Sequence, residues 1–349
     1  MIALIEKLEH QRILSQEEFV ALIEGRTEKA ARILVEKAML LRQKHYAREV
    51  YLRGLIEFTN YCKNDCYYCG IRCSNTQAQR YRLMPEEILD CCKLGYDLGY
   101  RTFVLQGGED PWYTPERIED LVRRIKREYP DCAVTLSVGE QSREVYQRWF
   151  EAGADRYLLR HETADFDHYH TLHPKRMSPE NRQRCLWDLK EIGYQVGCGF
   201  MVGSPGQSAL HLARDLQFIH QLQPHMVGVG PFIPQKDTPF GGEPAGTLEL
   251  TLYLLSIIRL MLPECLLPAT TALGTIHPRG RELGLLAGGN VCMPNLSPVA
   301  VREKYALYDN KICTGEEAAE CVQCLHRRIE SVGLQVASTR GDHCSLLER

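Results

Sequence analysis

The sequence predicts an α/β protein built as a (β/α)8 TIM-type barrel. Short strand-like runs alternate with helical stretches along most of the chain, and chemically distinctive residues come directly after those runs. Eight candidate strands with seven helices between them match the count of such a barrel, whose functional residues gather at the carboxyl ends of its strands. A length of 349 residues suits one barrel with an addition at each end.

The candidate strands are short apolar runs, and the candidate helices repeat apolar residues at helical spacing. The strands are expected at 52–59, 102–106, 133–138, 156–160, 195–202, 226–230, 266–271 and 290–293. The helices between them are expected at 85–98, 114–128, 143–152, 179–192, 208–222, 248–262 and 279–286. Pro85, Pro115 and Pro179 suit first-turn positions, where a missing N–H costs nothing.

Additions are expected on both sides of the barrel, which should span residues 51–295. Residues 1–50 should form a helical extension, in which Ser15 and Glu18 have the spacing of a capping box. Residues 296–349 should form an appendage with a helix near 318–332 and a polar tail.

Composition excludes several classes of protein. Hydrophobic residues are 44% and charged residues 25% of the chain, which argues against disorder, and a net charge of −3 favours neither a nucleic-acid partner nor a membrane surface. Arg259, Pro263 and Glu264 interrupt the most apolar stretch, so no membrane span is expected. Because Glu6 and Lys7 place charges near the N-terminus, no secretory signal is expected, and the fifteen cysteines are expected to stay reduced in the cytoplasm.

The first strand is followed by Cys62, Cys66 and Cys69, spaced C-x3-C-x2-C. Structural zinc sites and [4Fe–4S] clusters normally take four protein ligands, so three thiolates on one loop would leave one iron open for an outside ligand. Cys73 could supply a fourth thiolate, but we expect it to be a bystander. This spacing at the end of a first barrel strand resembles the radical S-adenosylmethionine (radical-SAM) superfamily, and Tyr68 matches the aromatic residue placed near the adenine.

The resemblance implies that the three cysteines hold a [4Fe–4S] cluster and that SAM binds its open iron. Gly107, Gly108 and Glu109 resemble the superfamily's GGE element, which meets the methionine ammonium. Glu162 is expected to pair with the positive end of SAM and Arg182 with its carboxylate, while Arg160 should face the substrate or the ribose. The other expected contacts of the cofactor are Ser137, Met293 and Tyr305 or Tyr308.

A second cluster of cysteines lies in the appendage, where Cys313, Cys321 and Cys324 are spaced C-x7-C-x2-C. Three thiolates could hold a second Fe–S cluster, either [4Fe–4S] or [2Fe–2S], and the alternative is a trio of surface cysteines.

With both clusters, the chain resembles the HydE family of [FeFe]-hydrogenase maturases over nearly its whole length. The shared segments are 80–87, 105–110, 157–163, 226–234 and 268–275. The resemblance implies a role in building the H-cluster, in which a 5′-deoxyadenosyl radical attacks the sulfur of a cysteine-bound iron carbonyl/cyanide precursor. It also implies other maturases as partners and a flavodoxin or ferredoxin as electron donor.

An anionic organometallic substrate needs donors at the barrel mouth, and Thr135, Thr270 and Thr271 offer hydroxyls there. Two other functions stay open: a mutase that resembles methylornithine synthase and acts on an amino acid, and a non-catalytic Fe–S carrier. Glu109, Arg160 and Glu162 favour an enzyme, since a carrier does not need charges that bind SAM.

Overall fold

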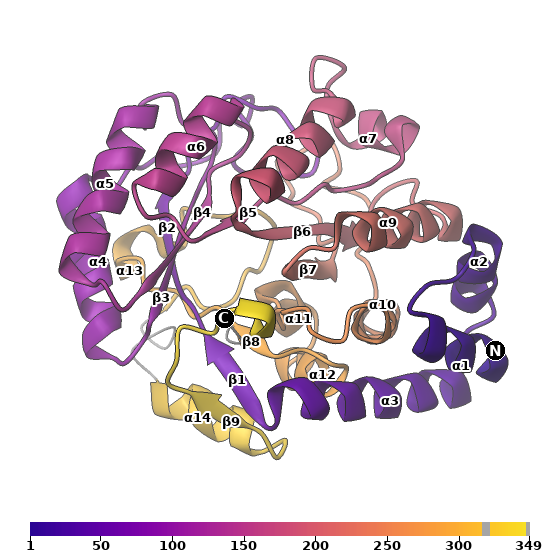
Figure 1. The fold of residues 1–349 in the computed structure, drawn as a ribbon. Coiled ribbons are helices and arrows are strands. Elements are labelled where there is room, and N and C mark those ends of the chain that lie inside the picture. The colour runs from indigo at the N-terminus through magenta and orange to yellow at the C-terminus, as the bar shows by residue number, and fades with distance from the viewer. Residues whose placement is uncertain (316–321, 347–349) are drawn as a thin grey trace.

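A computed structural model describes residues 1–315 and 322–346 of the chain. Three helices come first: α1 (Ile2–Gln11), α2 (Gln16–Glu24) and α3 (Glu28–Tyr46). The expected capping box is confirmed, because Ser15 and Glu18 each accept a hydrogen bond from the other's backbone N–H. Helix α2 packs on α9 and helix α3 on α10, so this extension lies against the outer helices of the barrel (Figure 1).

Parallel strands form the inside of the molecule. Six of them pair in chain order: β2 (Gly54–Thr59), β3 (Thr102–Gly107), β4 (Ala133–Ser137), β5 (Arg156–Leu158), β6 (Gln195–Val202) and β7 (Met226–Pro231). A smaller sheet has the order β8-β1-β9 and contains β1 (Glu49–Leu52), β8 (Val291–Cys292) and β9 (Gln335–Ala337). Single parallel bridges join Met226 to Leu266, Pro268 to Val291 and Leu55 to Asn295, which close the ring between β7 and β2.

The expected strand at 266–271 is wrong, since only Leu266 and Pro268 form bridges there. Pro268 has no N–H to donate to a neighbouring strand, and Thr270 already caps a helix through a hydrogen bond from Leu273 N. The first expected strand also divides at Arg53, into β1 and β2.

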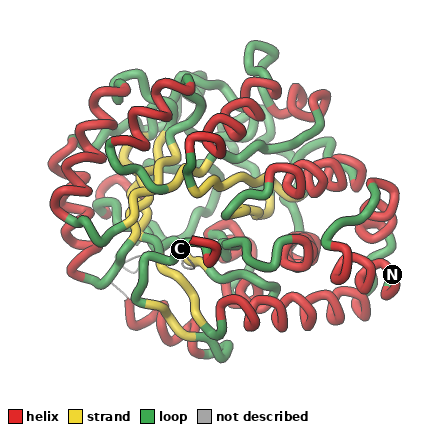
Figure 2. The backbone as a smooth tube through the Cα atoms, in the orientation of Figure 1, coloured by secondary structure: helices red, strands yellow, loops and turns green. Residues whose placement is uncertain are grey.

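Helices surround the strands on the outside (Figure 1, Figure 2). They are α4 (Pro85–Asp97), α5 (Pro115–Glu128), α6 (Arg143–Glu151), α7 (Phe166–Leu172), α8 (Pro179–Ile192), α9 (Ala209–Leu222), α10 (Leu248–Met261), α11 (Thr271–Ile276), α12 (Gly280–Leu286), α13 (Val299–Arg302) and α14 (Val322–Glu330). The prolines occupy first-turn positions in α4, α5 and α8, as expected, whereas the short helices α7 and α11 were not predicted. No helix within the described ranges is both long and apolar enough to cross a bilayer.

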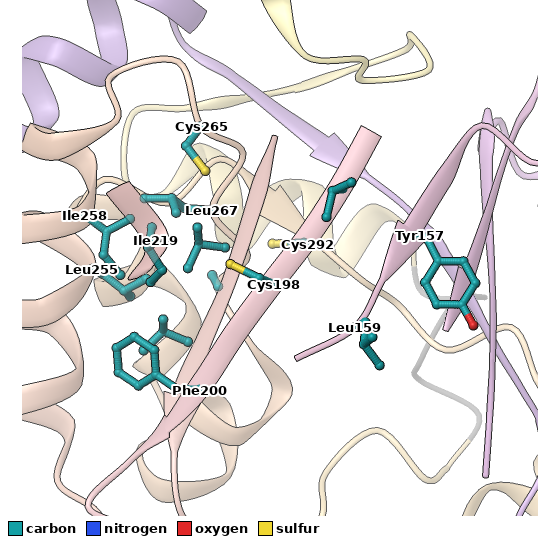
Figure 3. Packing of buried hydrophobic residues seen from close by; sticks show 14 of the residues in the cluster. Tyr157, Leu159, Cys198, Phe200, Ile219, Leu255, Ile258, Cys265, Leu267 and Cys292 are labelled. Carbon is teal, nitrogen blue, oxygen red and sulfur yellow. The ribbon is translucent and has the colours of Figure 1, made fainter. Parts of the chain in front are cut away.

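Several cysteines are packed in the hydrophobic core and do not line the cavity. Cys198, Cys265 and Cys292 are buried among apolar side chains such as Phe200 and Leu267 (Figure 3). Burial raises the pKa of the Cys265 thiol to about 12, so it stays protonated and behaves as a small apolar residue.

The C-terminal tail is polar, as expected, but it packs against the barrel. Strand β9 pairs with β1, and the described part of the tail then crosses the amino-terminal end of the barrel, near the middle of the ring of strands in Figure 1. The Arg340 carbonyl accepts hydrogen bonds from Thr102 and Arg156, and Asp342 accepts from Arg156 and Gln195 at 2.5 and 2.7 Å.

Candidate active site

A cavity of about 370 Å³ lies at the carboxyl ends of the strands. Its wall includes the loop after β2, the ends of β3 and β4, the turn after β5 and the segment from Tyr305 to Lys311. Most of the expected site residues line it: Cys62, Cys66, Tyr68, Cys69, Gly107, Gly108, Glu109, Ser137, Arg160, Glu162, Arg182, Thr270, Thr271, Met293, Tyr305 and Tyr308. Residues far apart in the sequence therefore line the same cavity.

Three cysteines of the loop after β2 line this cavity, and each is half-buried. Asn60 fixes the start of the loop, because its side chain donates to the carbonyls of Gln79 and Lys304 at 2.8 and 2.7 Å. Cys73, by contrast, is exposed and absent from the residues that line the cavity. Three convergent thiols without a fourth among the described residues of the wall fit a [4Fe–4S] cluster with one open iron.

The thiols need a metal to ionise. Burial raises the pKa of Cys62 and raises that of Cys69 to about 12. Metal ligation requires the thiolate, which burial disfavours. Positively charged irons would stabilise the thiolates in this cavity.

Gly108 permits a close approach between the end of β3 and the cysteine loop. A Cβ atom there would lie 2.2 Å from the Tyr61 carbonyl oxygen and 2.7 Å from Cys62 Cβ. The neighbouring Glu109 is nearly buried, accepts a hydrogen bond from Glu140 N at 3.1 Å, and lies 3.1 Å from Lys63 Nζ. Glu109 therefore already has a cationic partner, which sequence analysis missed.

Arg160 and Glu162 reach the cavity from the turn beyond β5, since the strand ends at Leu158. Glu162 has a positive φ of 66°, and its backbone N–H donates to the Gly199 carbonyl at 3.0 Å. Arg160 Nη2 lies 3.3 Å from Glu162 Oε2, yet neither atom makes a well-oriented hydrogen bond to any described residue. Buried polar atoms without such a partner suit a charged ligand, as SAM would be.

Arg182 on α8 is buried and makes two contacts at the cavity wall. Its Nε donates to Glu140 Oε1 at 2.5 Å, and its Nη1 donates to the Arg160 carbonyl at 3.1 Å. The residues from 137 to 140 were expected at this end of the barrel, but the role of Glu140 as the partner of Arg182 was not predicted. Its carboxylate orients the guanidinium towards the cavity.

Tyr68 is held by a neutral histidine. Burial and the nearby Arg182 lower the pKa of His173 to about 3. Its Nδ1 lies 3.0 Å from the Tyr169 carbonyl, so Nδ1 carries the proton and Nε2 accepts from the Tyr68 hydroxyl at 3.2 Å. This bond fixes the tyrosine ring at the cavity wall.

Thr135 is absent from the site, contrary to expectation. It shares a face of β4 with Ser137 but lies two residues deeper, where it lines a separate small cavity with Arg53 and Arg156. Thr270 and Thr271 do line the main cavity, although Thr270 Oγ1 accepts the helix-capping hydrogen bond of α11.

A buried ion pair in the cavity wall was missed. Glu57 on β2 lies 2.6 Å from Lys311 Nζ and accepts from Asn295 Nδ2 at 2.8 Å. Lys311 also donates to the Tyr305 carbonyl at 3.0 Å. Glu57 could have been noticed, because it is a charged residue between the apolar Ile56 and Phe58 of an expected strand.

The structure describes two of the three cysteines of the second group. Cys321 falls beyond the described residues. Cys313 is half-buried, and its Sγ lies 2.8 Å from Nη2 of Arg281, a residue of the cavity wall. Cys324 is on α14, with Arg327 Nη2 3.4 Å from its Sγ.

A parallel barrel with three cysteines after its first strands and paired charges around one cavity defines a radical-SAM enzyme. The model of the Radical SAM superfamily matches residues 56–219. The chain is 48% identical to the [FeFe] hydrogenase maturase subunit HydE of Thermotoga maritima over 293 residues, which cover 84% of this chain and 83% of that protein. The chain belongs to the HydE family of this superfamily, and membership implies a [4Fe–4S] cluster and SAM.

Other relatives share the fold. The chain is 30% identical to 3-methylornithine synthase of Methanosarcina acetivorans over 93% of its length and 91% of that protein's. The crystal structure of methylornithine synthase (PylB) matches with a TM-score of 0.85 and 29% identity, covering 96% of this chain and 97% of the other. The crystal structure of the hydrogenase maturase HydG matches with a TM-score of 0.82, covering 100% and 78%, but at 19% identity it shows the fold alone.

Proposed function

We propose that the protein takes part in building the H-cluster of [FeFe]-hydrogenase. The observation that carries this proposal is 48% identity to a HydE maturase subunit, in a chain whose three-cysteine loop and charged residues share one cavity. Two further partners are proposed with it: the other hydrogenase maturases, and a flavodoxin or ferredoxin as electron donor.

In this proposal Cys62, Cys66 and Cys69 hold the cluster, and Glu162 and Arg182 meet the ammonium and carboxylate of SAM. When bound, the cluster and SAM would supply a 5′-deoxyadenosyl radical for attack on the sulfur of a cysteine-bound iron carbonyl/cyanide substrate; one electron from the donor would break the sulfonium–C5′ bond and leave methionine. Each charge of SAM needs a partner in the cavity, because a desolvated ion without one costs several kcal/mol.

The remaining residues of the wall give the cofactor and the substrate their positions. Glu140 holds the Arg182 guanidinium, and His173 holds the Tyr68 ring against which the adenine would lie. Thr271 and Arg160 offer a hydroxyl and a positive charge to an anionic substrate. Met293 and Tyr305 supply apolar surface for the adenosine.

The test begins with the cysteines. Cys62→Ala should abolish release of 5′-deoxyadenosine after anaerobic reconstitution with iron and sulfide and incubation with SAM and dithionite, because two thiolates hold the cluster poorly. The matched control is Cys73→Ala, which removes an exposed thiol from the same loop and should stay near the wild-type rate. Wild-type SAM cleavage in Cys62→Ala would exclude the assigned ligands.

A second assay separates the proposed role from the alternative. The similarity to 3-methylornithine synthase favours an amino-acid mutase as the second candidate. The reconstituted protein should support maturation of [FeFe]-hydrogenase in a mixture with the partner maturases and the iron–cysteine substrate. Rearrangement of a free amino acid, with no gain in hydrogenase activity, would favour the mutase.

We also propose that Cys313, Cys321 and Cys324 bind a second Fe–S cluster that is separable from catalysis. It belongs to the appendage, which follows the last barrel strand in the sequence. The variant with all three changed to Ala should lose iron and keep SAM cleavage within about twofold, because neither Cys313 nor Cys324 is among the residues that line the cavity. Iron content and 5′-deoxyadenosine release measure the two effects, and loss of cleavage with an intact circular dichroism spectrum would contradict separability.

A further inference from the structure

A second group of metal-ligating side chains lies at the opposite end of the barrel from the cavity. His45 is near the end of α3, four residues before β1, Glu264 is in the turn before the Leu266 bridge, and Cys344 begins the 3-10 helix η1 (Cys344–Leu346). One ligand atom from each of the three residues lies within 4.8 Å of the other two. Three segments that are distant in the sequence thus present a nitrogen, an oxygen and a sulfur to one point.

The spacing is close to that of a tetrahedral metal site. Zinc binds such atoms at about 2.0–2.3 Å, which places neighbouring ligand atoms about 3.3–3.8 Å apart. His45 Nδ1 and Glu264 Oε1 are 3.7 Å apart, within that interval. The widest separation allowed by the cluster, 4.8 Å, would have to shorten by about 1 Å, a small displacement for a side chain near the chain end.

The surroundings prepare these groups to act as ligands. The Tyr46 hydroxyl donates to the Glu264 backbone carbonyl and lies 3.7 Å from Cys344 Sγ, so one side chain contacts two of the three segments that carry the ligands. Lys44, Arg12 and Arg259 lie near His45, and the carboxylate and thiolate would offset their charge.

We propose that His45, Glu264 and Cys344 bind one zinc ion, or a similar soft divalent cation, with water in the fourth position. Histidine, carboxylate and thiolate are ligands that zinc accepts together, and the half-exposed Glu264 leaves an open side for water. The bound ion fastens the end of the tail to the barrel, because Cys344 follows directly after Asp342 and His343, which contact Arg156 and Gln195. The site lies at the opposite end of the barrel from the cavity, so it is separate from the SAM reaction.

Zinc content measures the site. Protein loaded with its Fe–S clusters under anaerobic conditions is dialysed against buffered Zn²⁺, and bound zinc and iron are counted by mass spectrometry. The wild type should retain one more zinc per chain than His45→Gln or Cys344→Ser, and loss of a ligand should weaken affinity by about tenfold or more. Zinc should also raise the thermal midpoint of the wild type and not that of the variants, since a ligand of the folded state stabilises it.

The controls keep this inference falsifiable. His10→Gln removes an exposed histidine from α1 and should bind zinc as the wild type does. If Cys344→Ser disturbs the tail and the protein loses iron, the zinc content of Glu264→Gln tests the site instead. The Glu264 side chain is 49% exposed, so its replacement leaves the packing intact. Equal zinc content and equal thermal shifts in the wild type and all ligand variants would overturn the site.

Discussion

The charged residues around the cavity are arranged in pairs. Arg182 is fixed by Glu140, Glu109 by Lys63, and Arg160 lies beside Glu162. A guanidinium offers several donors in one plane, and Arg182 uses Nε and Nη1 for contacts with the protein. Its Nη2 is thereby the donor that can face a carboxylate in the cavity.

Arg182→Lys should weaken SAM binding by about tenfold or more while the cluster still assembles. A lysine cannot contact Glu140, the Arg160 carbonyl and a ligand carboxylate with the fixed geometry of a guanidinium. The measurement is a SAM titration that follows the EPR signal of the reduced cluster. Arg184→Lys, an exposed change on the same helix, serves as the control; unchanged affinity in Arg182→Lys would place the SAM carboxylate elsewhere.

For individual residues, the sequence was informative where residues of one chemical type are closely spaced along the chain. Cys62, Cys66 and Cys69 could be chosen from fifteen cysteines because they are close together and follow a strand. The partners Glu140 and Lys311 could not be chosen, because their roles arise from side chains that are 42 and 254 positions away along the chain. Thr135 was misplaced because alternation along a strand predicts the face but not the depth.

At the scale of elements, the segment from Tyr305 to Lys311 packs against the cysteine loop. Gly70 N donates to the Leu307 carbonyl at 2.9 Å, and a Cβ at Gly70 would lie 2.0 Å from the Ala306 carbonyl oxygen. The far end of the segment is anchored by the ion pair between Lys311 and Glu57, which is buried in the wall. This segment therefore shapes one side of the cavity and depends on one buried pair.

Lys311→Met should destabilise the protein by about 3–5 kcal/mol, because it leaves the Glu57 carboxylate buried without its cation. The thermal midpoint and the rate of SAM cleavage should both fall. Adding Glu57→Gln to Lys311→Met should recover part of the stability, since no buried charge is then unpaired. Lys236→Met, an exposed change, is the control, and equal midpoints in all four proteins would show that the pair anchors nothing.

Elements were predictable where local patterns decide them. Alternating strands and helices indicated the barrel, and prolines marked the starts of α4, α5 and α8. The strand expected at 266–271 was wrong because the folded chain uses this segment in two other ways. Pro268 forms a single bridge, and Thr270 caps a helix. Hydrophobic pattern does not distinguish these roles.

In the whole molecule the two ends of the barrel differ. The carboxyl ends of the strands surround the cavity, whereas the tail crosses the other end and satisfies polar groups there. Arg53 donates to the Gly341 carbonyl at 3.2 Å, and Arg156 donates to Asp342. The tail, predicted from the sequence only to be polar, supplies partners for buried arginines, a relation that composition cannot reveal.

Asp342 should stabilise the contact between the tail and the amino-terminal end of the barrel in a pH-dependent way. Burial alone would raise its pKa, but Arg156, Gln195 and Arg340 more than offset that effect and hold the pKa at about 2, below the ordinary 3.8. Because the folded-state pKa is the lower one, the stabilisation is complete above about pH 4 and is lost as the pH falls towards 2. A difference of nearly two pKa units corresponds to about 2 kcal/mol at neutral pH.

Asp342→Asn should therefore lower the free energy of unfolding by about 2 kcal/mol at pH 7. The difference between the variant and the wild type should stay constant from pH 8 to about pH 5 and should shrink below about pH 4, where the wild-type aspartate in the unfolded chain becomes protonated. Urea unfolding of both proteins in the same cluster state, across this range, measures it. Asp97→Asn, which breaks only an exposed pair with Lys93, should change stability by less than about 0.5 kcal/mol. A difference for Asp342→Asn that is small at neutral pH, or that grows on acidification, would mean that the tail does not depend on this carboxylate.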